Sequence, residues 1–143
     1  MQYRESRTAD ISRIIQLLKA NDLPHSDVDG EKIKFIIGEN ASGIQACIGL
    51  EKYGADGLLR SFAVTDALKG QGIGHHLLQL FYDFCKNENV LTLHLLTTTA
   101  KDYFLKNGFM ETDKLAAPDS ILATSEFSEL CPASSTYMTS QNF

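Results

Sequence analysis

Three strand-like segments follow one another in the first half of the sequence with only short turns between them. Their apolar residues alternate with other residues, and they span 32–39, 43–53 and 58–64. The turns at 40–43 and 54–57 are rich in Gly, Asn and Asp, which favour tight reversals of the chain. Strands joined so closely pair in opposite directions, because a parallel pair needs a crossover of about a dozen residues. The sequence therefore predicts an antiparallel meander at the centre of the fold.

Helical patterns and further strand patterns lie on both sides of this meander. Before it, the sequence predicts a strand at 2–6 and a helix that has Thr8 as its N-cap and ends near Asn21. After it, the predicted elements are a helix over 73–87, a strand at 91–95, a short helix over 100–107, strands at 109–114 and 135–140, and an irregular helix from Pro118. This order predicts an α/β (α+β) fold with a mixed, mostly antiparallel sheet flanked by helices. The length of 143 residues suits one domain, which we expect to span 1–143.

Residues 21–30 have the composition of a loop. They combine Pro24 with Asp27 and Asp29, which are typical of turns. A domain boundary at this point would leave too small a fragment before it. We therefore expect the segment to lie over a cleft rather than to link two domains.

The charge of the chain argues against polyanionic partners. It carries 13 Lys and Arg against 18 Asp and Glu, a net charge of −5, and its basic residues form no long cluster. Nucleic acid and anionic membranes are therefore not expected as partners. The N-terminus lacks the apolar core of a signal peptide, and no window reaches the roughly 18 apolar residues of a membrane span, so we expect a cytoplasmic protein.

The cysteines and histidines show no metal-binding spacing. The three cysteines are Cys47, Cys85 and Cys131. They are odd in number, far apart and without a CxxC pair, so we expect reduced thiols rather than disulfides or a zinc site. His75 and His76 are adjacent on a predicted helix and diverge from each other, so no metal is expected there. His25 and His94 are predicted to be surface or interface residues.

The most informative segment is the run Lys69-Gly70-Gln71-Gly72-Ile73-Gly74 at the start of the predicted helix over 73–87. Closely spaced glycines that enter a helix expose successive backbone N–H groups beside the positive end of the helix dipole. Such a turn suits a phosphate or pyrophosphate, and a purely structural tight turn is the alternative. A dinucleotide fingerprint is excluded because its third glycine position is His75, and the Gly-Lys-Ser/Thr of NTPase phosphate loops is absent.

Three segments in order resemble the GNAT superfamily of acetyl-CoA-dependent N-acetyltransferases. They are Phe62-Ala63-Val64, the run from Lys69 to Gly74, and Tyr103-Phe104-Leu105-Lys106-Asn107-Gly108-Phe109. The order of predicted elements fits the same superfamily over nearly the whole chain. The resemblance implies a GNAT-like fold and the transfer of acetyl from acetyl-CoA to an amine. Lys69 stands where the superfamily motif has Gln or Arg, whereas Gly72 and Gly74 match it.

The resemblance also assigns residues to acetyl-CoA. The expected cofactor-binding residues are Phe62, Ala63, Val64, Lys69, Gly70, Gln71, Gly72, Ile73, Gly74, His75 and Phe104. The pyrophosphate is expected against 69–75, and a backbone N–H within 62–64 is expected to meet the thioester carbonyl. Phe104 occupies the position, four residues before Gly108, where the superfamily often has the tyrosine that protonates the CoA thiolate. Tyr103 is adjacent and is the candidate for that role, although we expect no side chain to be an indispensable general acid.

The candidates on the acceptor side are Glu51, Arg60 and Ser61. Glu51, near the end of a central strand, is expected to lie in the cleft and to take a proton from the amine, with a solvated glutamate as the alternative. Arg60 is a charged residue in the apolar run 58–64 and therefore needs a partner. We expect Arg60, with Ser61 beside it, to bind an anionic group of an amino-acid-like acceptor. The alternative is an internal ion pair to Glu51 or another carboxylate.

Alternation along the strand 58–64 separates the side chains of Arg60 and Ser61. It places Arg60 on one face with Phe62 and Val64, and Ser61 on the other face with Leu59 and Ala63. The two side chains therefore need not both enter the cleft.

A narrower resemblance is to the small acetyltransferases encoded with arsenic-resistance genes. It is carried by the segments 49–51, 53–54, 58–61, 95–99 and 127–134. It implies a link to arsenic or toxin resistance, and three thiols that converge on an arsenical are an alternative to isolated cysteines.

The expected function is N-acetylation of a small-molecule amine by acetyl-CoA. The first rival is a degenerate GNAT domain that binds acyl-CoA as a sensor, which the missing tyrosine favours. The second rival is a non-enzymatic domain whose glycine turn is purely structural. A homodimer is left open.

Overall fold

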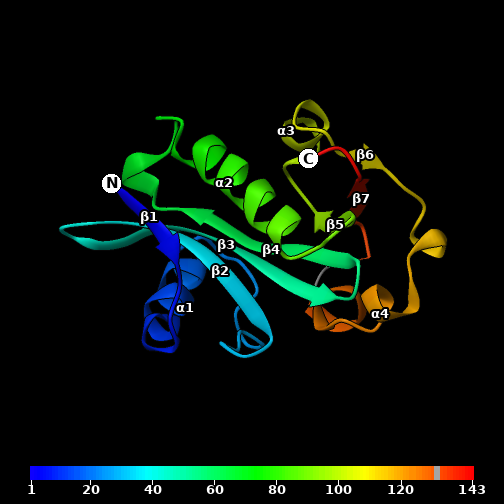
Figure 1. The fold of residues 1–143 in the computed structure, drawn as a ribbon, viewed down its shortest axis with the longest axis horizontal. Coiled ribbons are helices and arrows are strands. Elements are labelled where there is room, and N and C mark those ends of the chain that lie inside the picture. Colours follow the sequence, from blue (N-terminus) through cyan, green and yellow to red (C-terminus); the bar gives the residue numbers. More distant parts are fainter. Residues whose placement is uncertain (131–132) are drawn as a thin grey trace.

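A computed structural model of the chain describes residues 1–130 and 133–143, and the strands in these ranges form one seven-stranded sheet (Figure 1). The strands are β1 (Gln2–Glu5), β2 (Ile33–Asn40), β3 (Gly43–Tyr53), β4 (Asp56–Val64), β5 (Thr92–Thr97), β6 (Met110–Glu111) and β7 (Thr136–Ser140). The helices are α1 (Ile11–Ala20), α2 (Ile73–Asn87), α3 (Lys101–Lys106) and α4 (Asp119–Leu122). Short 3-10 turns are η1 (Thr8–Asp10), η2 (Asp66–Leu68) and η3 (Lys114–Ala116), and η4 (Glu126–Leu130) is a π-helical turn.

The sheet has the mixed, mostly antiparallel arrangement that the sequence predicts. Its strand order is β1-β2-β3-β4-β5-β7-β6, and every neighbouring pair is antiparallel except β4 with β5. The predicted meander is confirmed as β2, β3 and β4. The predicted strand over 109–114 is wrong in its length, because β6 ends at Glu111 and Lys114 already belongs to η3.

The entry into α1 differs from the prediction. Thr8 is not the N-cap, because it already belongs to η1 and Arg7 precedes that turn. The backbone N–H of Arg7 donates to Oδ2 of Asp10 at 2.8 Å. The carboxylate of Asp10 thus stabilises the start of the helix from inside the first turn.

Helices cover both faces of the sheet (Figure 1). The buried residues of α2 are Leu77, Leu78, Phe81, Tyr82 and Cys85, and they pack on Ala46, Ile48 and Leu50 of β3. The buried residues of α1 are Ile14, Leu17 and Leu18, and they pack on Ile33, Phe35 and Ile37 of β2. Ile121 of α4 packs on Leu58 and Tyr137. The helix α1 and the segment that contains α4 lie on one side of the sheet and α2 on the other, which leaves β4 between them.

Strands β4 and β5 are joined at one short contact. Residues 56–58 pair in parallel with 92–94. Beside this join, His94 Nε2 lies 2.8 Å from Oδ1 of Asp56, and Nδ1 lies 2.7 Å from the hydroxyl of Tyr137, whose ring stacks on the imidazole. His94 is 3% exposed, so its prediction as a surface or interface residue is wrong. The contact couples the two halves of the sheet.

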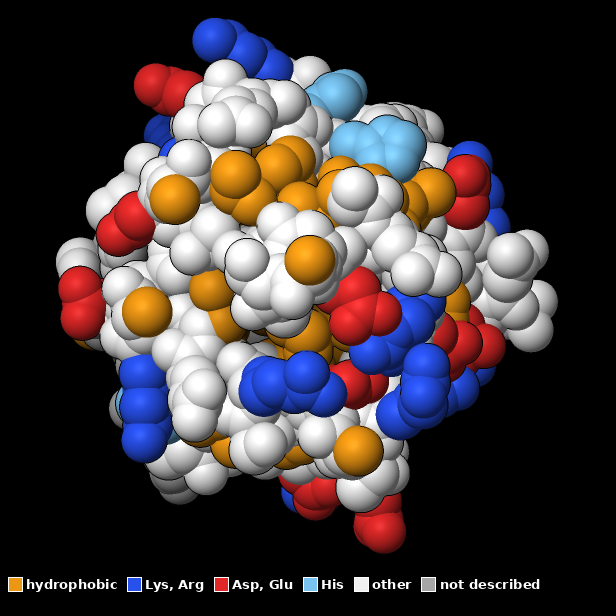
Figure 2. Space-filling model, turned by 90° about the vertical axis from the view of Figure 1, so that its left-hand side faces the viewer, with side chains coloured by type: hydrophobic (Ala, Val, Ile, Leu, Met, Phe, Trp, Pro, Cys, Tyr) orange, Lys and Arg blue, Asp and Glu red, His pale blue; other side chains and the backbone are white. Residues whose placement is uncertain are grey.

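Charges of both signs mix on the surface that carries β1 (Figure 2). Acidic side chains lie between basic ones there instead of leaving a continuous basic patch. Arg4 of β1, for example, donates to Asp10 at 2.8 Å and to Glu39 at 2.7 Å. No helix in the described part of the chain is long and apolar enough to cross a membrane.

Candidate active site

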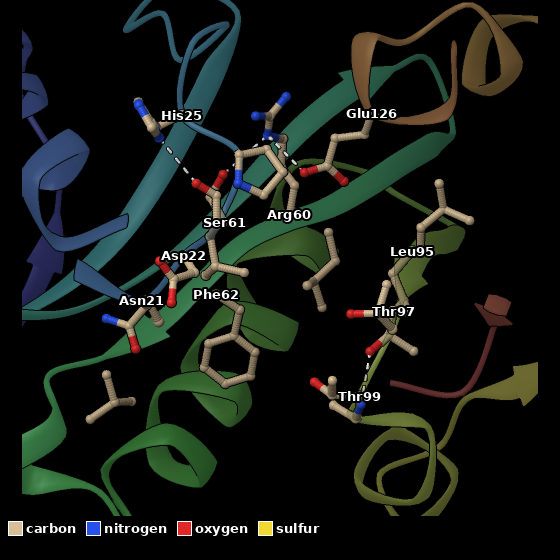
Figure 3. Close-up of a pocket in the computed structure, with 18 of the residues that line it drawn as sticks. Asn21, Asp22, His25, Arg60, Ser61, Phe62, Leu95, Thr97, Thr99 and Glu126 are labelled. Atoms are coloured by element: carbon tan, nitrogen blue, oxygen red, sulfur yellow. Dashed lines mark hydrogen bonds and ion pairs between the residues drawn. The ribbon is translucent and has the colours of Figure 1, made fainter. Parts of the chain in front are cut away.

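A cleft opens where β4 and β5 part. The two strands pair at 56–58 with 92–94 and diverge beyond that point. The cavity between them has a volume of about 1160 Å³ (Figure 3). The main lining segments are 59–64 from β4, 95–100 from β5 and the start of α3, and 21–26 from the loop after α1. The loop therefore lies over a cleft, as its composition predicts.

An extra residue in β4 redirects its side chains at the cleft. The pairing of β4 with β3 leaves Ser61 and Phe62 together opposite Ile48. Ser61 takes a left-handed backbone conformation with φ of 56°. Its carbonyl oxygen accepts a hydrogen bond from Sγ of Cys47 at 3.2 Å. The result is a β-bulge, which shifts the alternation of side chains by one residue.

The bulge overturns the faces that simple alternation predicts for β4. Leu59 and Phe62 both pack toward α2. Arg60 and Ser61 lie on the same side as each other, because Nε of Arg60 donates to Oγ of Ser61 at 3.1 Å. The prediction that placed Arg60 with Phe62 and Ser61 with Leu59 is wrong, because alternation cannot anticipate an inserted residue. Both polar side chains therefore line the cleft.

The glycine loop before α2 presents a row of free backbone N–H groups. Gly70 and Gly72 both have φ of 80°, and a Cβ at either position would meet no atom within 4 Å. The N–H groups of residues 70–75 find no acceptor in the described part of the chain. The helix α2 begins at Ile73, so these groups lie at the positive end of its dipole. The loop therefore fits the pyrophosphate that the sequence resemblance implies.

The cofactor-binding residues expected from the sequence lie in two adjoining places. Those that line the cleft are Phe62, Ala63, Val64, Lys69 and Phe104. Those that form the glycine loop and the first turn of α2 are Gly70, Gln71, Gly72, Ile73, Gly74 and His75. A Cβ on Gly74 would lie 3.5 Å from the side chain of Val64, so the first turn of α2 adjoins the cleft. The ammonium of Lys69 pairs with Asp66 at 2.7 Å on the exposed surface.

Tyr103 and Phe104 both line the cleft from α3. Phe104 is buried in the core on the α2 side of the sheet. The hydroxyl of Tyr103 is also buried and has no hydrogen-bond partner among the described residues. Burial raises the pKa of this phenol, so it keeps its proton at neutral pH. The hydroxyl is thus a protonated donor with no partner among the described residues, on a side chain that lines the cleft.

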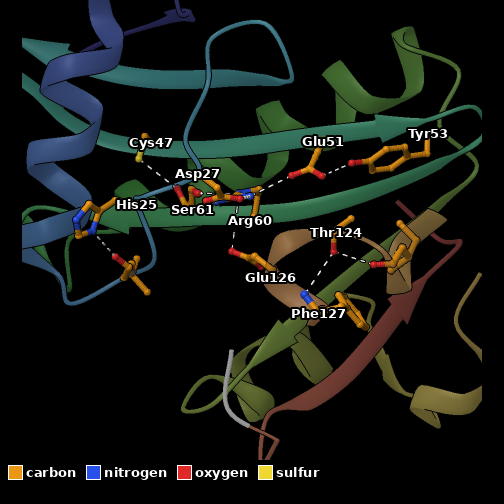
Figure 4. A network of polar contacts seen from close by, with 12 residues as sticks. His25, Asp27, Cys47, Glu51, Tyr53, Arg60, Ser61, Thr124, Glu126 and Phe127 are labelled. Carbon is orange, nitrogen blue, oxygen red and sulfur yellow. Dashed lines mark hydrogen bonds and ion pairs between the residues drawn. The ribbon is translucent and has the colours of Figure 1, made fainter. Parts of the chain in front are cut away.

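Arg60 lies at the centre of a buried polar network (Figure 4). Arg60 is only 2% exposed. The guanidinium donates to both carboxylate oxygens of Asp27, at 2.5 and 2.6 Å, and to Oε1 of Glu51 at 3.0 Å. With the bond to Ser61, four of its five N–H donors are used inside the chain. The structure therefore shows the internal ion pair that the sequence left as the alternative, and Arg60 has no free fork for an acceptor anion.

Glu51 does not lie in the cleft, contrary to expectation. It is absent from the residues that line the cavity, and it belongs to β3, one strand further from the opening. Its carboxylate accepts hydrogen bonds from Arg60 and from the hydroxyl of Tyr53. Glu51 is 6% exposed, so a solvated glutamate is also wrong. The hydrogen bond from Arg60 keeps the Glu51 carboxylate on the β3 side of β4, away from the cleft between β4 and β5.

Glu126 of η4 is a carboxylate that does line the cleft (Figure 3). It is 5% exposed, and its nearest cation is Nε of Arg60 at 3.8 Å, beyond hydrogen-bond length. Burial raises its pKa to about 7, although Arg60 offsets part of this effect. The sequence contains no signal that marks Glu126, because this residue stands in an irregular segment without periodicity or motif spacing.

The remaining candidate residues do not form a second site. Cys47 packs in the core beside α1 and Cys85 in the core beside α2, on opposite faces of the sheet. Both thiols are free, and burial raises the pKa of Cys47 to about 12. Cys131 lies outside the described residues. His25 is half-buried and lines the open cleft. No group of three or more His, Cys, Asp and Glu residues suited to a metal occurs within 1–130 and 133–143.

A family model matches most of the segments that build this site, apart from the loop before β2 and Glu126. The model describes an acetyltransferase (GNAT) domain, and it matches residues 31–111. This range contains the three strands of the meander, the glycine loop, α2, β5 and α3.

Solved structures share the fold over the full length of the chain. Rv2747 from Mycobacterium tuberculosis, solved with CoA and NLQ, is 19% identical with a TM-score of 0.80, and the match covers 100% of both chains. N-acetylglutamate synthase from Neisseria gonorrhoeae, solved with coenzyme A and N-acetyl-glutamate, is 17% identical with a TM-score of 0.78, over 99% of this chain and 35% of that one. A GNAT-family acetyltransferase from Staphylococcus aureus is 17% identical with a TM-score of 0.75, over 97% of each chain. At these identities the likeness shows the fold.

Proposed function

The chain belongs to the GNAT acetyltransferases, enzymes that act on CoA-linked acyl groups, and from this membership we propose that it moves an acetyl group from acetyl-CoA to the amino group of a small molecule. The observation that carries the proposal is the junction of two features. A row of free N–H groups at the start of α2 adjoins a cleft between diverging strands. The first feature suits a pyrophosphate, and the second has room for an extended thiol arm and an acceptor.

The residues that would hold acetyl-CoA follow from this junction. When bound, acetyl-CoA supplies the acetyl group as an activated thioester. The N–H groups of 70–75 would bind the phosphates, with Lys69 nearby as a positive charge. Among the described residues, the edge of β4 that faces β5 has no strand partner beyond Leu58, so backbone N–H groups within 62–64 can polarise the thioester carbonyl.

The test separates the proposal from its two rivals. Acetyl-CoA is expected to raise the melting temperature of the protein, and an amine screen is expected to release free CoA thiol. A rise in melting temperature without thiol release from any amine would favour a sensor that binds acyl-CoA. If acetyl-CoA, propionyl-CoA and CoA all leave the melting temperature unchanged, the glycine loop is a structural turn and the proposal is wrong.

The variant Tyr103→Phe tests the general-acid role. It removes a buried hydroxyl that has no partner among the described residues, so the melting temperature of the unliganded protein is expected to rise by about 2–4 °C. We expect most of kcat to remain, because water can protonate a thiolate of moderate pKa. Calorimetric scans with and without acetyl-CoA, together with steady-state kinetics, measure both effects. A fall in kcat of about a thousandfold would instead make Tyr103 the general acid.

The acceptor is proposed only as a small-molecule amine. The expectation of an amino-acid-like acceptor depends on Arg60 binding the anionic group of the acceptor. In the structure, the guanidinium of Arg60 instead donates to both carboxylate oxygens of Asp27. The N-acetyl-glutamate bound by the Neisseria synthase is an anionic product of that enzyme.

A link to arsenic or toxin resistance is a further part of the proposal. It is supported by the sequence segments that resemble acetyltransferases encoded with arsenic-resistance genes, which are 49–51, 53–54, 58–61, 95–99 and 127–134. A substrate screen that includes an amine bearing an arsonate group tests it directly. If no arsenic-containing amine reacts while other amines do, the link to arsenic chemistry fails and the acetyltransferase proposal stands.

A further inference from the structure

Glu126 lies at the end of the cleft nearest the join of β4 and β5. Arg60 and Ser61 stand beside it there, whereas Val64 and Lys69 line the opposite end, next to the glycine loop. A phosphate on the glycine loop and a thioester along β4 would therefore leave the Glu126 end for the acceptor. This carboxylate is the group that an incoming amine would meet.

The Glu126 carboxylate lacks a hydrogen-bond donor among the described residues. Its side chain is 7% exposed, and the nearest guanidinium nitrogen lies 3.8 Å away and donates instead to Ser61. A buried carboxylate without a donor is costly, because it has lost its hydration without replacement. An ammonium group has three N–H donors and a positive charge, so it would supply both the missing hydrogen bond and a charge that balances the carboxylate.

The charge around Arg60 favours a cation at this end of the cleft. Three carboxylates surround one guanidinium, and two of them, Asp27 and Glu51, already accept its hydrogen bonds. An acceptor carboxylate placed beside Glu126 would meet these negative charges at a guanidinium whose hydrogen bonds already go to Asp27 and Glu51. An acceptor ammonium would reduce this excess of negative charge.

We infer that Glu126 binds the acceptor amine as its ammonium ion and then takes a proton from it, and that the acceptor is a cationic amine without a carboxylate beside its amino group. This inference rests on the proposed acetyl transfer. It assigns the base to η4 instead of β3, and it replaces the amino-acid-like acceptor expected from the sequence.

The proton transfers balance as follows. The ammonium gives one proton to the carboxylate of Glu126, which later passes it to solvent. The neutral nitrogen then attacks the thioester carbonyl carbon, so a C–N bond forms and the C–S bond breaks. The second proton lost by the nitrogen ends on the leaving thiolate. The products are the N-acetyl amide, CoA with a free thiol, and one proton released to water.

The pH dependence follows from the groups that face Glu126. Burial raises its pKa to about 7, the positive charge of Arg60 lowers it in part, and the negative charges of Asp27 and Glu51 raise it. A protonated Glu126 cannot accept the proton of the amine. We therefore expect kcat/KM for the amine to fall on the acidic side of an apparent pKa near 7.

The variant Glu126→Gln keeps the shape of the side chain and removes its charge. We expect kcat/KM for the amine to fall by about 100-fold or more and the acidic limb of the pH profile to disappear, with the Kd of acetyl-CoA unchanged. The melting temperature at pH 8 is expected to rise, since a folded-state pKa raised to about 7 means that stability is lost as pH rises from about 4.5 to 7. The rise should be smaller at pH 5.

Glu51→Gln is the matched control, since it also removes a carboxylate beside Arg60 but lies outside the cleft lining. The acidic limb is expected to persist in this variant. If the limb disappears in Glu51→Gln and persists in Glu126→Gln, the base is Glu51 and the inference is overturned. If Glu126→Gln keeps kcat/KM within threefold of the parent, Glu126 has no role in proton transfer.

Pairs of amines that differ by one carboxylate test the acceptor class. Agmatine with arginine, tyramine with tyrosine, and histamine with histidine are compared in thiol release and in calorimetric binding to the CoA-saturated protein. In each pair that binds, the amine without the carboxylate is expected to have at least a tenfold higher kcat/KM or affinity. A preference for the amino acids, or no binding by any of the six, overturns the inference. Binding of acetyl-CoA by itself reports separately on the proposed function.

Discussion

Replacement of Arg60 by methionine is expected to lower the free energy of unfolding at pH 7.5 by about 3–5 kcal/mol, the usual cost of breaking a buried ion pair from one side. The side chain is fully buried and holds Asp27 through two hydrogen bonds and Glu51 through a third. Methionine is unbranched and carries no charge, so the buried Glu51 and the half-buried Asp27 would both lose their cation. Urea unfolding measures the loss, and the melting temperature should fall by about 10–15 °C.

The pH dependence of this loss has a definite sign. In the parent, burial acts to raise the pKa of Asp27, but the hydrogen bonds and charge of Arg60 outweigh burial and lower the pKa below its ordinary value. The stabilisation from this pair is therefore complete above the unfolded-state pKa of aspartate and is lost as pH falls through the lower folded-state value. In Arg60→Met the opposing effect of Arg60 is lost, so the carboxylate of Asp27 protonates at a higher pH than in the parent. The difference in stability between parent and variant should shrink as pH falls toward 4.

Arg4→Met is the control for this experiment. Arg4 also pairs with two carboxylates, those of Asp10 and Glu39, but its side chain is 18% exposed at the edge strand β1. Glu39 is 26% exposed and can be solvated, and the buried Asp10 keeps the backbone N–H of Arg7 and the guanidinium of Arg13 as partners. The loss of stability should therefore be smaller than in Arg60→Met and weakly dependent on pH. Equal losses in Arg4→Met and Arg60→Met would show that burial of the Arg60 network contributes nothing specific.

Replacement of Gly72 by valine is expected to weaken the binding of acetyl-CoA by about 100-fold or more, the scale of one or two lost charge-assisted hydrogen bonds. Gly72 has φ of 80°, which a β-branched residue strongly disfavours, so the loop must change its path. A side chain there would also occupy the open space beside the N–H groups of 70–75, where a phosphate must approach. Calorimetric titration with acetyl-CoA measures the change.

Gly54→Val separates backbone strain from the loss of the binding site. Gly54 has φ of 63° and equally open surroundings, but it lies in the turn between β3 and β4, remote from the glycine loop. Both variants should have a lower free energy of unfolding, but only Gly72→Val should bind acetyl-CoA more weakly. Tight binding of acetyl-CoA by Gly72→Val would place the pyrophosphate elsewhere.

The parts of the fold that depend on neighbouring residues could be predicted from the sequence. The meander over 33–64 follows from alternation and short turns, and α2 follows from an apolar stripe behind a glycine run. The free N–H groups of the glycine loop also follow, because a helix start leaves its first donors without partners. These features need no information about distant parts of the chain.

The features that shape the acceptor end depend on residues far apart in the sequence. The bulge at Ser61 appears only when β4 is paired with β3, and alternation within β4 contains no sign of it. The bond between Arg60 and Asp27 joins positions 33 residues apart, through a loop whose path no periodicity describes. Glu126 reaches the cleft from an irregular segment. The sequence could therefore indicate that Arg60 needs a partner, but not which carboxylate it selects or which one it leaves unpaired.

The short join between β4 and β5 has a consequence for how the protein assembles. Strands β2–β4 form the meander from near neighbours in the chain, whereas Asp56 and Thr92 can pair only after α2 has closed the long connection between them, and β5 pairs with β7 across a longer separation still. Contacts with a high sequence separation form late, because the entropy of closing the loop must be overcome first. The half built from β5, β7 and β6 therefore docks last, and it is also the half that detaches most easily in brief openings of the folded protein. A ligand in the cleft touches both halves, so it should slow amide hydrogen exchange in β5 and β7 far more than in β2.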